Sequence, residues 1–250
     1  MRSQKKENEI LLFITCLVDN FFPEVGEAML RVLSKMGMNV EFPKNQTCCA
    51  QPAFNSGHRK EAGKVARHFL DVFARSDKAI VCPSGSCVSM VKNYYAEILR
   101  DDPERLSRAK EVSSRIYEFS EFIYSRKETF RLESRYRGKV TFHDSCHALR
   151  ELGISSQPRE IIRSLDGVEL VEMNMPDACC GFGGTFSIKY PEVSKSMLKE
   201  KTDSILDSGA DAVVSTDMGC LMNIKGLVSR KKMPVKVLHL AELIAFEDTK

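Results

Sequence analysis

Eight of the nine cysteines in this chain of 250 residues fall into two sets with nearly the same spacing. The first set comprises Cys16, Cys48, Cys49 and Cys87, and the second comprises Cys146, Cys179, Cys180 and Cys220. Matching members of the two sets are 130 to 133 residues apart. A duplicated thiol pattern predicts two similar halves, each of which binds a ligand through sulfur.

Composition and charge exclude several classes of protein. The net charge is +3, far from the basic patch that nucleic-acid binding requires, so we expect no nucleic-acid partner. No run approaches the roughly 18 apolar residues of a membrane-spanning helix, so we expect no membrane span. The polar residues 1–9 and the short apolar run 10–14 do not resemble an export signal. We therefore expect a cytoplasmic protein with reduced thiols, in keeping with the odd number of cysteines.

Short β-rich runs alternate with amphipathic helical patterns in both halves. The predicted strands are residues 10–15, 38–42, 79–82, 139–142, 168–173 and 211–215. The predicted helices are residues 23–36, 62–73, 158–165 and 191–206. This alternation predicts an α/β fold: two similar halves, related by approximate two-fold symmetry, each with a short parallel sheet flanked by helices.

A charged segment, residues 100–137, separates the halves and has a helical pattern. Ile116, Phe119, Phe122 and Ile123 fall on one face of the expected helix, and residues 238–243 predict a similar helix after the second cysteine set. We therefore expect a first cysteine-rich domain with its linker helix at residues 8–137, and a second domain at residues 138–247.

The cysteines follow the predicted strands. Cys16 and Cys146 come after the first strand of each half, the adjacent pairs lie in loops after the second, and Cys87 and Cys220 open helices after the third. Ligands of open α/β sheets bind at the carboxyl ends of the strands, so each set should converge there. A helix N-terminus should also lower the pKa of Cys87 and Cys220 and favour the metal-binding thiolate.

Four thiolates per half suit either zinc or an iron–sulfur cluster. Adjacent side chains on an extended chain point to opposite faces, so an adjacent cysteine pair is a poor chelator of one small ion. A cluster can offer different iron atoms to the two thiolates. Because neither half contains the C-x₂-C knuckle typical of zinc sites, the pattern favours a cluster.

The segments around the thiols resemble a known family. CCG at residues 179–181, spaced from Cys146 and Cys220, is similar to the CCG cysteine-rich domain of heterodisulfide reductase and of the glycolate oxidase iron–sulfur subunit. Other segments resemble the lactate utilization protein A family nearly end to end. They are TCLVD at residues 15–19, CAQPAFNSG at 49–57, PSGSC at 83–87 and CGFGGTFS at 180–187.

This resemblance implies an iron–sulfur electron-transfer subunit in the oxidation of L-lactate to pyruvate. It implies a non-autonomous oxidoreductase subunit whose partners include a ferredoxin-like iron–sulfur protein. The eight patterned cysteines would hold up to two clusters of the 4Fe-4S type. The alternatives are a thiol–disulfide oxidoreductase of the heterodisulfide reductase type and a zinc-binding structural or regulatory protein. No nucleotide-binding fingerprint marks a flavin or nicotinamide site, which also favours partner subunits.

Several residues depart from the heterodisulfide reductase pattern or stand outside the sets. That pattern closes each set with C-x-x-C, whereas this chain has Ser84 and Asp217 at the first of those positions. The cubane and noncubane cluster types therefore both stay open. Cys82, which is matched by Ser215, is interpreted as a buried core thiol. His143 and His147 flank Cys146 and could bond a thiolate, move a proton or cap a loop.

Overall fold

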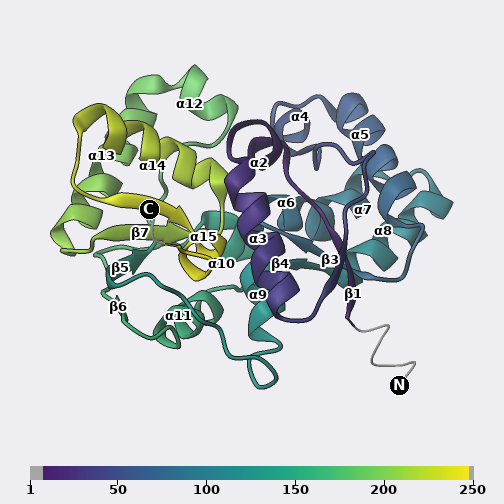
Figure 1. Ribbon diagram of the computed structural model, residues 1–250. Coiled ribbons are helices and arrows are strands. Elements are labelled where there is room, and N and C mark those ends of the chain that lie inside the picture. The colour runs from purple at the N-terminus through teal and green to yellow at the C-terminus, as the bar shows by residue number, and fades with distance from the viewer. Residues whose placement is uncertain (1–7, 248–250) are drawn as a thin grey trace. The chain divides into compact units, whose positions relative to one another are not determined.

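Two four-stranded parallel sheets form the framework of the computed structural model, which describes residues 8–247 (Figure 1). The strands of the first sheet are β1 (Glu9–Leu12), β2 (Asn39–Glu41), β3 (Ala79–Cys82) and β4 (Ile116–Glu118). Those of the second are β5 (Gly138–Phe142), β6 (Val168–Leu170), β7 (Ala212–Ser215) and β8 (Lys236–His239). Every pairing is parallel, which confirms the predicted α/β fold with two similar halves. The approximate two-fold relation between the halves stays a prediction.

The strand order is the same in both sheets and determines where a ligand can bind. The first sheet runs β2-β1-β3-β4 and the second β6-β5-β7-β8. In each half the chain therefore leaves the first strand toward one edge of the sheet and then crosses back to the other side. The connections diverge between β1 and β3, and between β5 and β7. In open α/β sheets ligands bind at the carboxyl ends of the strands at such a point.

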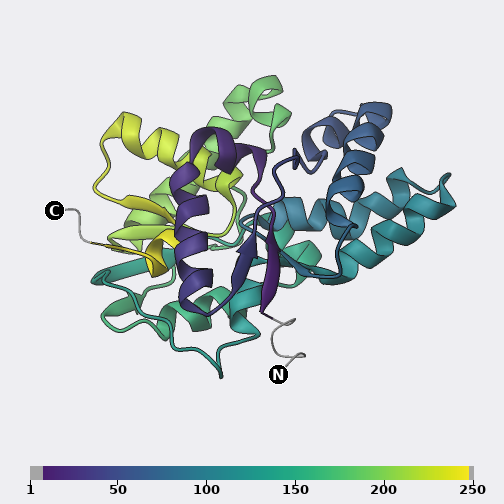
Figure 2. The same ribbon diagram turned by 45° about the vertical axis from the view of Figure 1, so that its right-hand side comes forward.

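The helices of the first half cover its sheet. They are α2 (Cys16–Phe21), α3 (Pro23–Lys35), α4 (Gln51–Asn55), α5 (Arg59–Phe73), α6 (Gly85–Ser89), the π-helical turn η1 (Met90–Tyr94), α7 (Tyr95–Ile98), α8 (Pro103–Arg115) and α9 (Phe119–Tyr124). Figure 2 shows α3 to one side of the strands, away from α5 and α8. Proline begins α3 and α8, where its fixed φ and missing N–H carry no cost.

The second half has a similar set of helices. They are α10 (Cys146–Leu152), α11 (Ser156–Arg163), α12 (Thr185–Lys189), α13 (Pro191–Asp207), α14 (Met218–Lys231) and α15 (Leu240–Ile244). Figure 1 shows α11 below the strands and α13 and α14 above them. The single helix α14 follows β7, whereas the matching segment after β3 is divided into α6, η1 and α7.

The fourth strand of each sheet was not predicted from the sequence. Residues 116–123 and 238–243 were each expected to form one helix, which is wrong. In each case a strand, β4 or β8, precedes a short helix, α9 or α15. The apolar residues satisfy a helical spacing, but the first part of each segment is extended because it pairs in parallel with β3 or β7. This edge pairing is a tertiary contact that local periodicity does not reveal.

Packing divides the chain after Phe122, inside α9. The residues that follow α9 attach to the second unit, since Ser134 donates a hydrogen bond to the carbonyl of Leu243 (2.6 Å) and Tyr136 contacts Phe246 edge to face. The domain limits 8–137 and 138–247 stay a prediction. No helix among residues 8–247 is long and apolar enough to cross a membrane. The predicted absence of an export signal rests on residues 1–14, of which 1–7 lie outside the described part.

Glu118, the last residue of β4, generates a prediction about stability. Its side chain is fully buried, and burial raises the pKa of its carboxyl group from 4.5 to about 8. One oxygen accepts from the Ser120 and Glu121 amides, but the other has no hydrogen-bond partner among the described residues. Because the folded state favours the protonated acid, its stability should fall as pH rises from about 4.5 to 8.

Replacement Glu118→Gln should flatten this dependence, since the amide cannot ionise and still offers an acceptor to Ser120. Urea unfolding of both proteins at pH 5, 6.5 and 8 measures the effect. We expect the variant to gain stability relative to the original chain as pH rises. Glu104→Gln, on the exposed side of α8, is the control and should leave the pH dependence unchanged. Parallel stability curves for the original chain and Glu118→Gln would contradict the prediction.

Candidate metal centres

The four cysteines of the first set converge at the carboxyl end of the first sheet. Cys16 begins α2 directly after β1, Cys48 and Cys49 lie in the loop between β2 and α4, and Cys87 lies in α6 after β3. The sulfur atoms of Cys16 and Cys48 are 3.8 Å apart, and those of Cys49 and Cys87 are 3.2 Å apart. The thiols of Cys48 and Cys49 also interact, so contacts join all four side chains.

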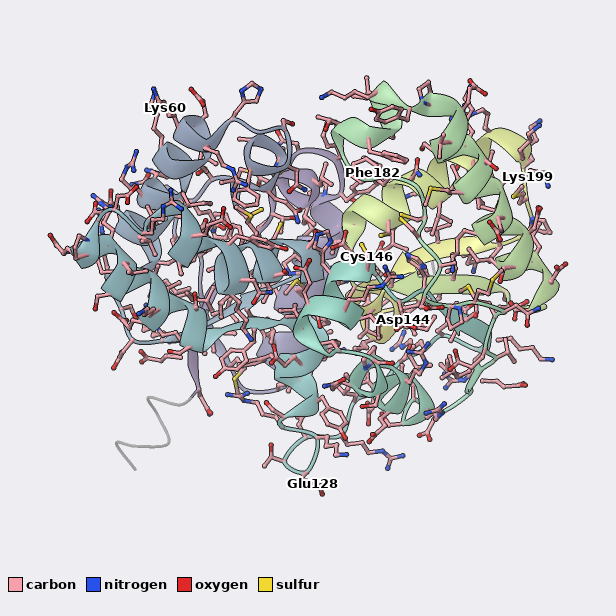
Figure 3. The ribbon with its side chains drawn as sticks, turned by 180° about the vertical axis from the view of Figure 1, so that it is seen from behind. Lys60, Glu128, Asp144, Cys146, Phe182 and Lys199 are labelled. Carbon is pink, nitrogen blue, oxygen red and sulfur yellow. The ribbon has the colours of Figure 1, made fainter. Side chains whose placement is uncertain are left out.

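The second set repeats this arrangement. Cys146 begins α10 after β5, Cys179 and Cys180 lie in the loop before α12, and Cys220 lies in the first turn of α14 after β7. The thiols of Cys146 and Cys179, of Cys179 and Cys180, and of Cys180 and Cys220 lie close enough to act on one another's protonation. Figure 3 shows Cys146 at the start of its helix. The structure therefore brings together the members of each predicted set, and their role as metal ligands stays a prediction.

The adjacent cysteines do not point to opposite faces, as an extended chain would require. Both thiols of each pair enter the same site. The chain turns immediately after each pair, where Ala50 (φ 76°) and Gly181 (φ 81°) adopt the left-handed conformation. The carbonyl of the second cysteine is also held in each half: Tyr95 donates to Cys49 (3.1 Å) and Asn223 donates to Cys180 (2.8 Å).

Each set contains one thiol with an acidic pKa. Thiol donors from Cys16 and Cys49 hold the pKa of Cys48 well below its usual range, and donors from Cys146 and Cys180 do the same for Cys179. The donors correspondingly lose acidity, because each shares its proton with its neighbour and is also desolvated by burial. These are matching positions in the two halves, so the first thiolate forms at the same place in both sets.

The expectation that a helix start would lower the pKa of Cys220 is wrong. Although Cys180 donates to it, burial and the negative Asp217 raise the pKa of the Cys220 thiol. Asp217 accepts from the amide of Gly219 (3.1 Å) and so caps α14. Ser84 caps α6 in the same way by accepting from the amide of Cys87 (3.4 Å). The two residues that replace a cysteine of the heterodisulfide reductase pattern are therefore helix caps here.

Cys82 is buried, as the sequence predicts for a core thiol, but it also lies against the first set. Its side chain is fully buried at the end of β3, and its thiol interacts with Cys87. The matching Ser215 donates a hydrogen bond to the carbonyl of His143 (2.9 Å). Cys82 therefore neighbours the first set, and its position at the end of an apolar strand did not reveal this.

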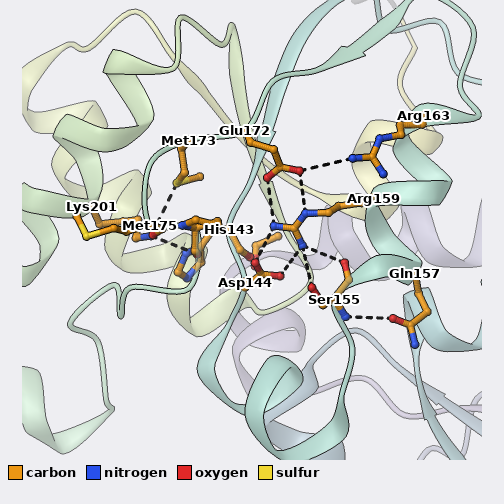
Figure 4. A network of polar contacts seen from close by, with 12 residues as sticks. His143, Asp144, Ser155, Gln157, Arg159, Arg163, Glu172, Met173, Met175 and Lys201 are labelled. Atoms are coloured by element: carbon orange, nitrogen blue, oxygen red, sulfur yellow. Dashed lines mark hydrogen bonds and ion pairs between the residues drawn. The ribbon is translucent and has the colours of Figure 1, made fainter.

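The second site contains charged and polar groups that sequence analysis did not assign (Figure 4). Lys201 on α13 is 1% exposed and donates to the carbonyls of Met175 (2.7 Å) and Pro176 (3.2 Å). Its charge acts on Cys180 and Cys220. Lys201 lies on the buried stripe of α13, three residues after Leu198 and four before Ile205. A lysine at that spacing was the signal that sequence analysis overlooked.

An ion-pair network holds the segment that carries Cys146. Arg159 on α11 binds both carboxylate oxygens of Asp144, at 2.8 and 2.7 Å, and also reaches Glu172 at 2.8 Å (Figure 4). Asp144 lies two residues before Cys146 and is 4% exposed. A bidentate pair of this kind orients its partners as well as attracting them. The matching residue in the first half is Ile14, so this network belongs to the second half alone.

The donors present at both sites fit a soft metal centre. Soft thiolate ligands select zinc and iron–sulfur clusters over hard cations. In each set two thiols are buried and two are partly exposed, so every site has a protected side and an accessible side. The buried thiols are Cys49, Cys87, Cys180 and Cys220, and the partly exposed ones are Cys16, Cys48, Cys146 and Cys179.

Comparison with known proteins relates the cysteine sets to a family. The family model described as a cysteine-rich domain, CCG, matches residues 10–92 and 140–225, one match in each half. Lactate utilization protein A of Halalkalibacterium halodurans is 42% identical over 240 residues, covering 96% of this chain and 98% of that protein. Lactate utilization protein A of an Exiguobacterium species is 43% identical, covering 94% of this chain and 96% of that protein.

A solved structure has a similar fold. A hypothetical protein from Helicobacter pylori aligns with a TM-score of 0.63 at 11% sequence identity. The alignment covers 97% of this chain and 50% of that chain, so the present chain spans half the length of that structure. At this identity the likeness extends to the fold alone.

Gly181 and Ala50 provide a matched pair of substitutions. A Cβ atom at Gly181 would lie 2.6 Å from the carbonyl oxygen of Ser194, and the φ of 81° disfavours any side chain. Gly181→Ala should therefore destabilise the second half by about 1–3 kcal/mol and displace Cys180. The converse change, Ala50→Gly, relieves an unfavourable φ and should be neutral or slightly stabilising.

Chemical unfolding measures both effects, and reaction of the thiols with a thiol-specific reagent reports whether Cys180 has moved. We expect faster labelling of the second set in Gly181→Ala and unchanged labelling in Ala50→Gly. Equal stability of Gly181→Ala and the original chain would contradict the prediction, since it would show that Ser194 can move away from the new Cβ atom without a loss of stability.

Proposed function

Because the chain belongs to the CCG cysteine-rich domain family, and within it to the lactate utilization protein A family, we propose that it takes part in lactate utilization as an iron–sulfur electron-transfer subunit. The overall reaction is the oxidation of L-lactate to pyruvate, carried out together with partner proteins. The observation that supports this best is the convergence of two sets of four thiols in a chain that aligns over 96% of its length with such a relative.

The proposed ligands are the eight patterned cysteines, four for each centre. A 4Fe-4S cluster, when bound, supplies one-electron transfer. The protein's part is to shield and orient. The buried thiols Cys49 and Cys87 keep water from one side, while Cys16 and Cys48 leave the other side accessible to a redox partner. The second set has the same division.

Because the sequence contains no fingerprint for a flavin or nicotinamide, a partner protein would remove the electron pair from the substrate. A ferredoxin-like iron–sulfur protein is the expected type of partner for one-electron exchange. The partly exposed cysteines mark the side of each centre at which such a partner would exchange electrons.

A zinc site is the second candidate, and one of the two sulfur–sulfur distances in the first set fits it. A zinc ion with Zn–S bonds of about 2.3 Å in tetrahedral geometry separates its sulfur ligands by roughly 3.8 Å. The Cys16–Cys48 distance is 3.8 Å, and the two thiols of each adjacent pair point into the same site. Because zinc brings no acid-labile sulfide, metal and sulfide analysis separates the two candidates.

Anaerobic purification followed by iron, zinc and acid-labile sulfide analysis tests the cluster proposal. We expect iron and sulfide in equal amounts, and Cys49→Ser or Cys180→Ser should each remove about half of both. Serine keeps the shape of cysteine, but its hydroxyl stays protonated and binds soft metals poorly. Cys82→Ser should retain iron, because Ser215 holds the matching position in the second half. A chain with zinc and no sulfide, or loss of iron in Cys82→Ser but not Cys49→Ser, would contradict the assignment.

Dependence on partners is tested by activity. The isolated chain should not oxidise L-lactate with a soluble dye acceptor, and activity should appear when the partner proteins are added. Rapid lactate oxidation by the chain alone would reveal an overlooked catalytic site. Reduction of a heterodisulfide by the isolated chain would instead support the thiol–disulfide oxidoreductase alternative.

A further inference from the structure

The two cysteine sets differ at one buried position. His143 is the residue that directly follows β5, three residues before Cys146. Phe13 occupies the matching position before Cys16. Phe13 is fully buried and packs edge to face against Phe69 and Phe73. The fold therefore does not require a polar side chain at this position. The imidazole in the second half therefore needs a different explanation.

The ring of His143 is buried, and its nitrogen atoms lack a well-formed hydrogen bond. Its side chain is 1% exposed, and neither ring nitrogen makes a hydrogen bond among the described residues. The carbonyl of Pro176 interacts with the ring, but its hydrogen bonds come from the Asp144 amide (3.1 Å) and from Lys201 (3.2 Å). A buried polar group without a hydrogen bond destabilises the folded state, so a compensating interaction is expected.

The ring faces the thiols of the second set. A ring nitrogen of His143 and the sulfur atoms of Cys180 and Cys220 all lie within 4.8 Å of one another. Donor atoms on one metal ion with bonds of about 2.0–2.3 Å are separated by less than this. Imidazole nitrogen and thiolate sulfur together form common donor sets for zinc and iron.

We propose that His143 is a metal ligand in the second half, next to Cys180 and Cys220, so that the second centre has a nitrogen donor that the first lacks. The inference rests on the proposed function only in requiring a metal at this set. A neutral imidazole adds no negative charge, so a metal coordinated by His143 together with Cys180 and Cys220 is less negative than one held by thiolates alone, and its reduction potential is higher, as in clusters that have histidine ligands. The two centres would then differ in potential although their cysteine patterns match.

X-ray absorption at the edge of the bound metal tests the inference on the full chain, purified without oxygen. In a Cys49→Ser background, in which the second set alone is intact, we expect a nitrogen neighbour in addition to sulfur. His143→Phe reproduces the first-half residue and should remove the nitrogen signal and weaken metal binding. His143→Cys should restore metal with a sulfur-only shell and a lower midpoint potential. His68→Gln, which removes an exposed imidazole of the first half, is the matched control and should change neither.

The outcomes separate this inference from the proposed function. Iron and sulfide with a sulfur-only shell in the original second set would overturn the role of His143 and leave the cluster proposal standing. Zinc with a nitrogen neighbour that disappears in His143→Phe would support the ligand role and overturn the cluster. A persistent nitrogen signal in His143→Phe would overturn the assignment to this residue. A chain without metal would overturn both.

Discussion

The convergence of thiols at the carboxyl ends of parallel strands is the constraint on which the rest of each half depends. Cys16 and Cys87 follow the neighbouring strands β1 and β3, and Cys146 and Cys220 follow β5 and β7. The adjacent pairs, Cys48–Cys49 and Cys179–Cys180, lie in the loops that follow the edge strands β2 and β6. A left-handed residue, Ala50 or Gly181, turns the chain there. Four thiols brought so close share protons, which explains why Cys48 and Cys179 become acidic at the expense of their neighbours.

The duplicated halves preserve the sulfur sites but not their surroundings. Around the first set the neighbouring positions are apolar, with Phe13 in an aromatic cluster and Ile14 beside it. Around the second set the matching residues are His143 and Asp144, and Lys201 adds a buried charge. Local charge and hydrogen bonding tune the potential of a metal–sulfur centre. The two halves therefore provide the same set of thiols in electrostatically different environments.

The sequence supported the fold class because it contains strong local signals. Local sequence alone reveals the apolar stripe of α3, the proline that begins it, and the apolar runs of β3 and β7. Similarly, the repeated cysteine spacing indicated which thiols should gather. The strands β4 and β8 were missed, because their apolar residues also fit a helical period and only pairing with β3 and β7 selects the extended form.

By itself, the amino-acid sequence determined the two-part α/β organisation and the eight thiols that converge, because periodicity and matched spacing are properties of the linear chain. Only the tertiary structure decided the environment of those thiols. The burial of the His143 ring, the buried charge of Lys201 and the contact between Cys82 and Cys87 each depend on how the folded segments pack. Burial and hydrogen-bond partners are properties of the folded chain, and they distinguish a ligand from a core side chain of the same type.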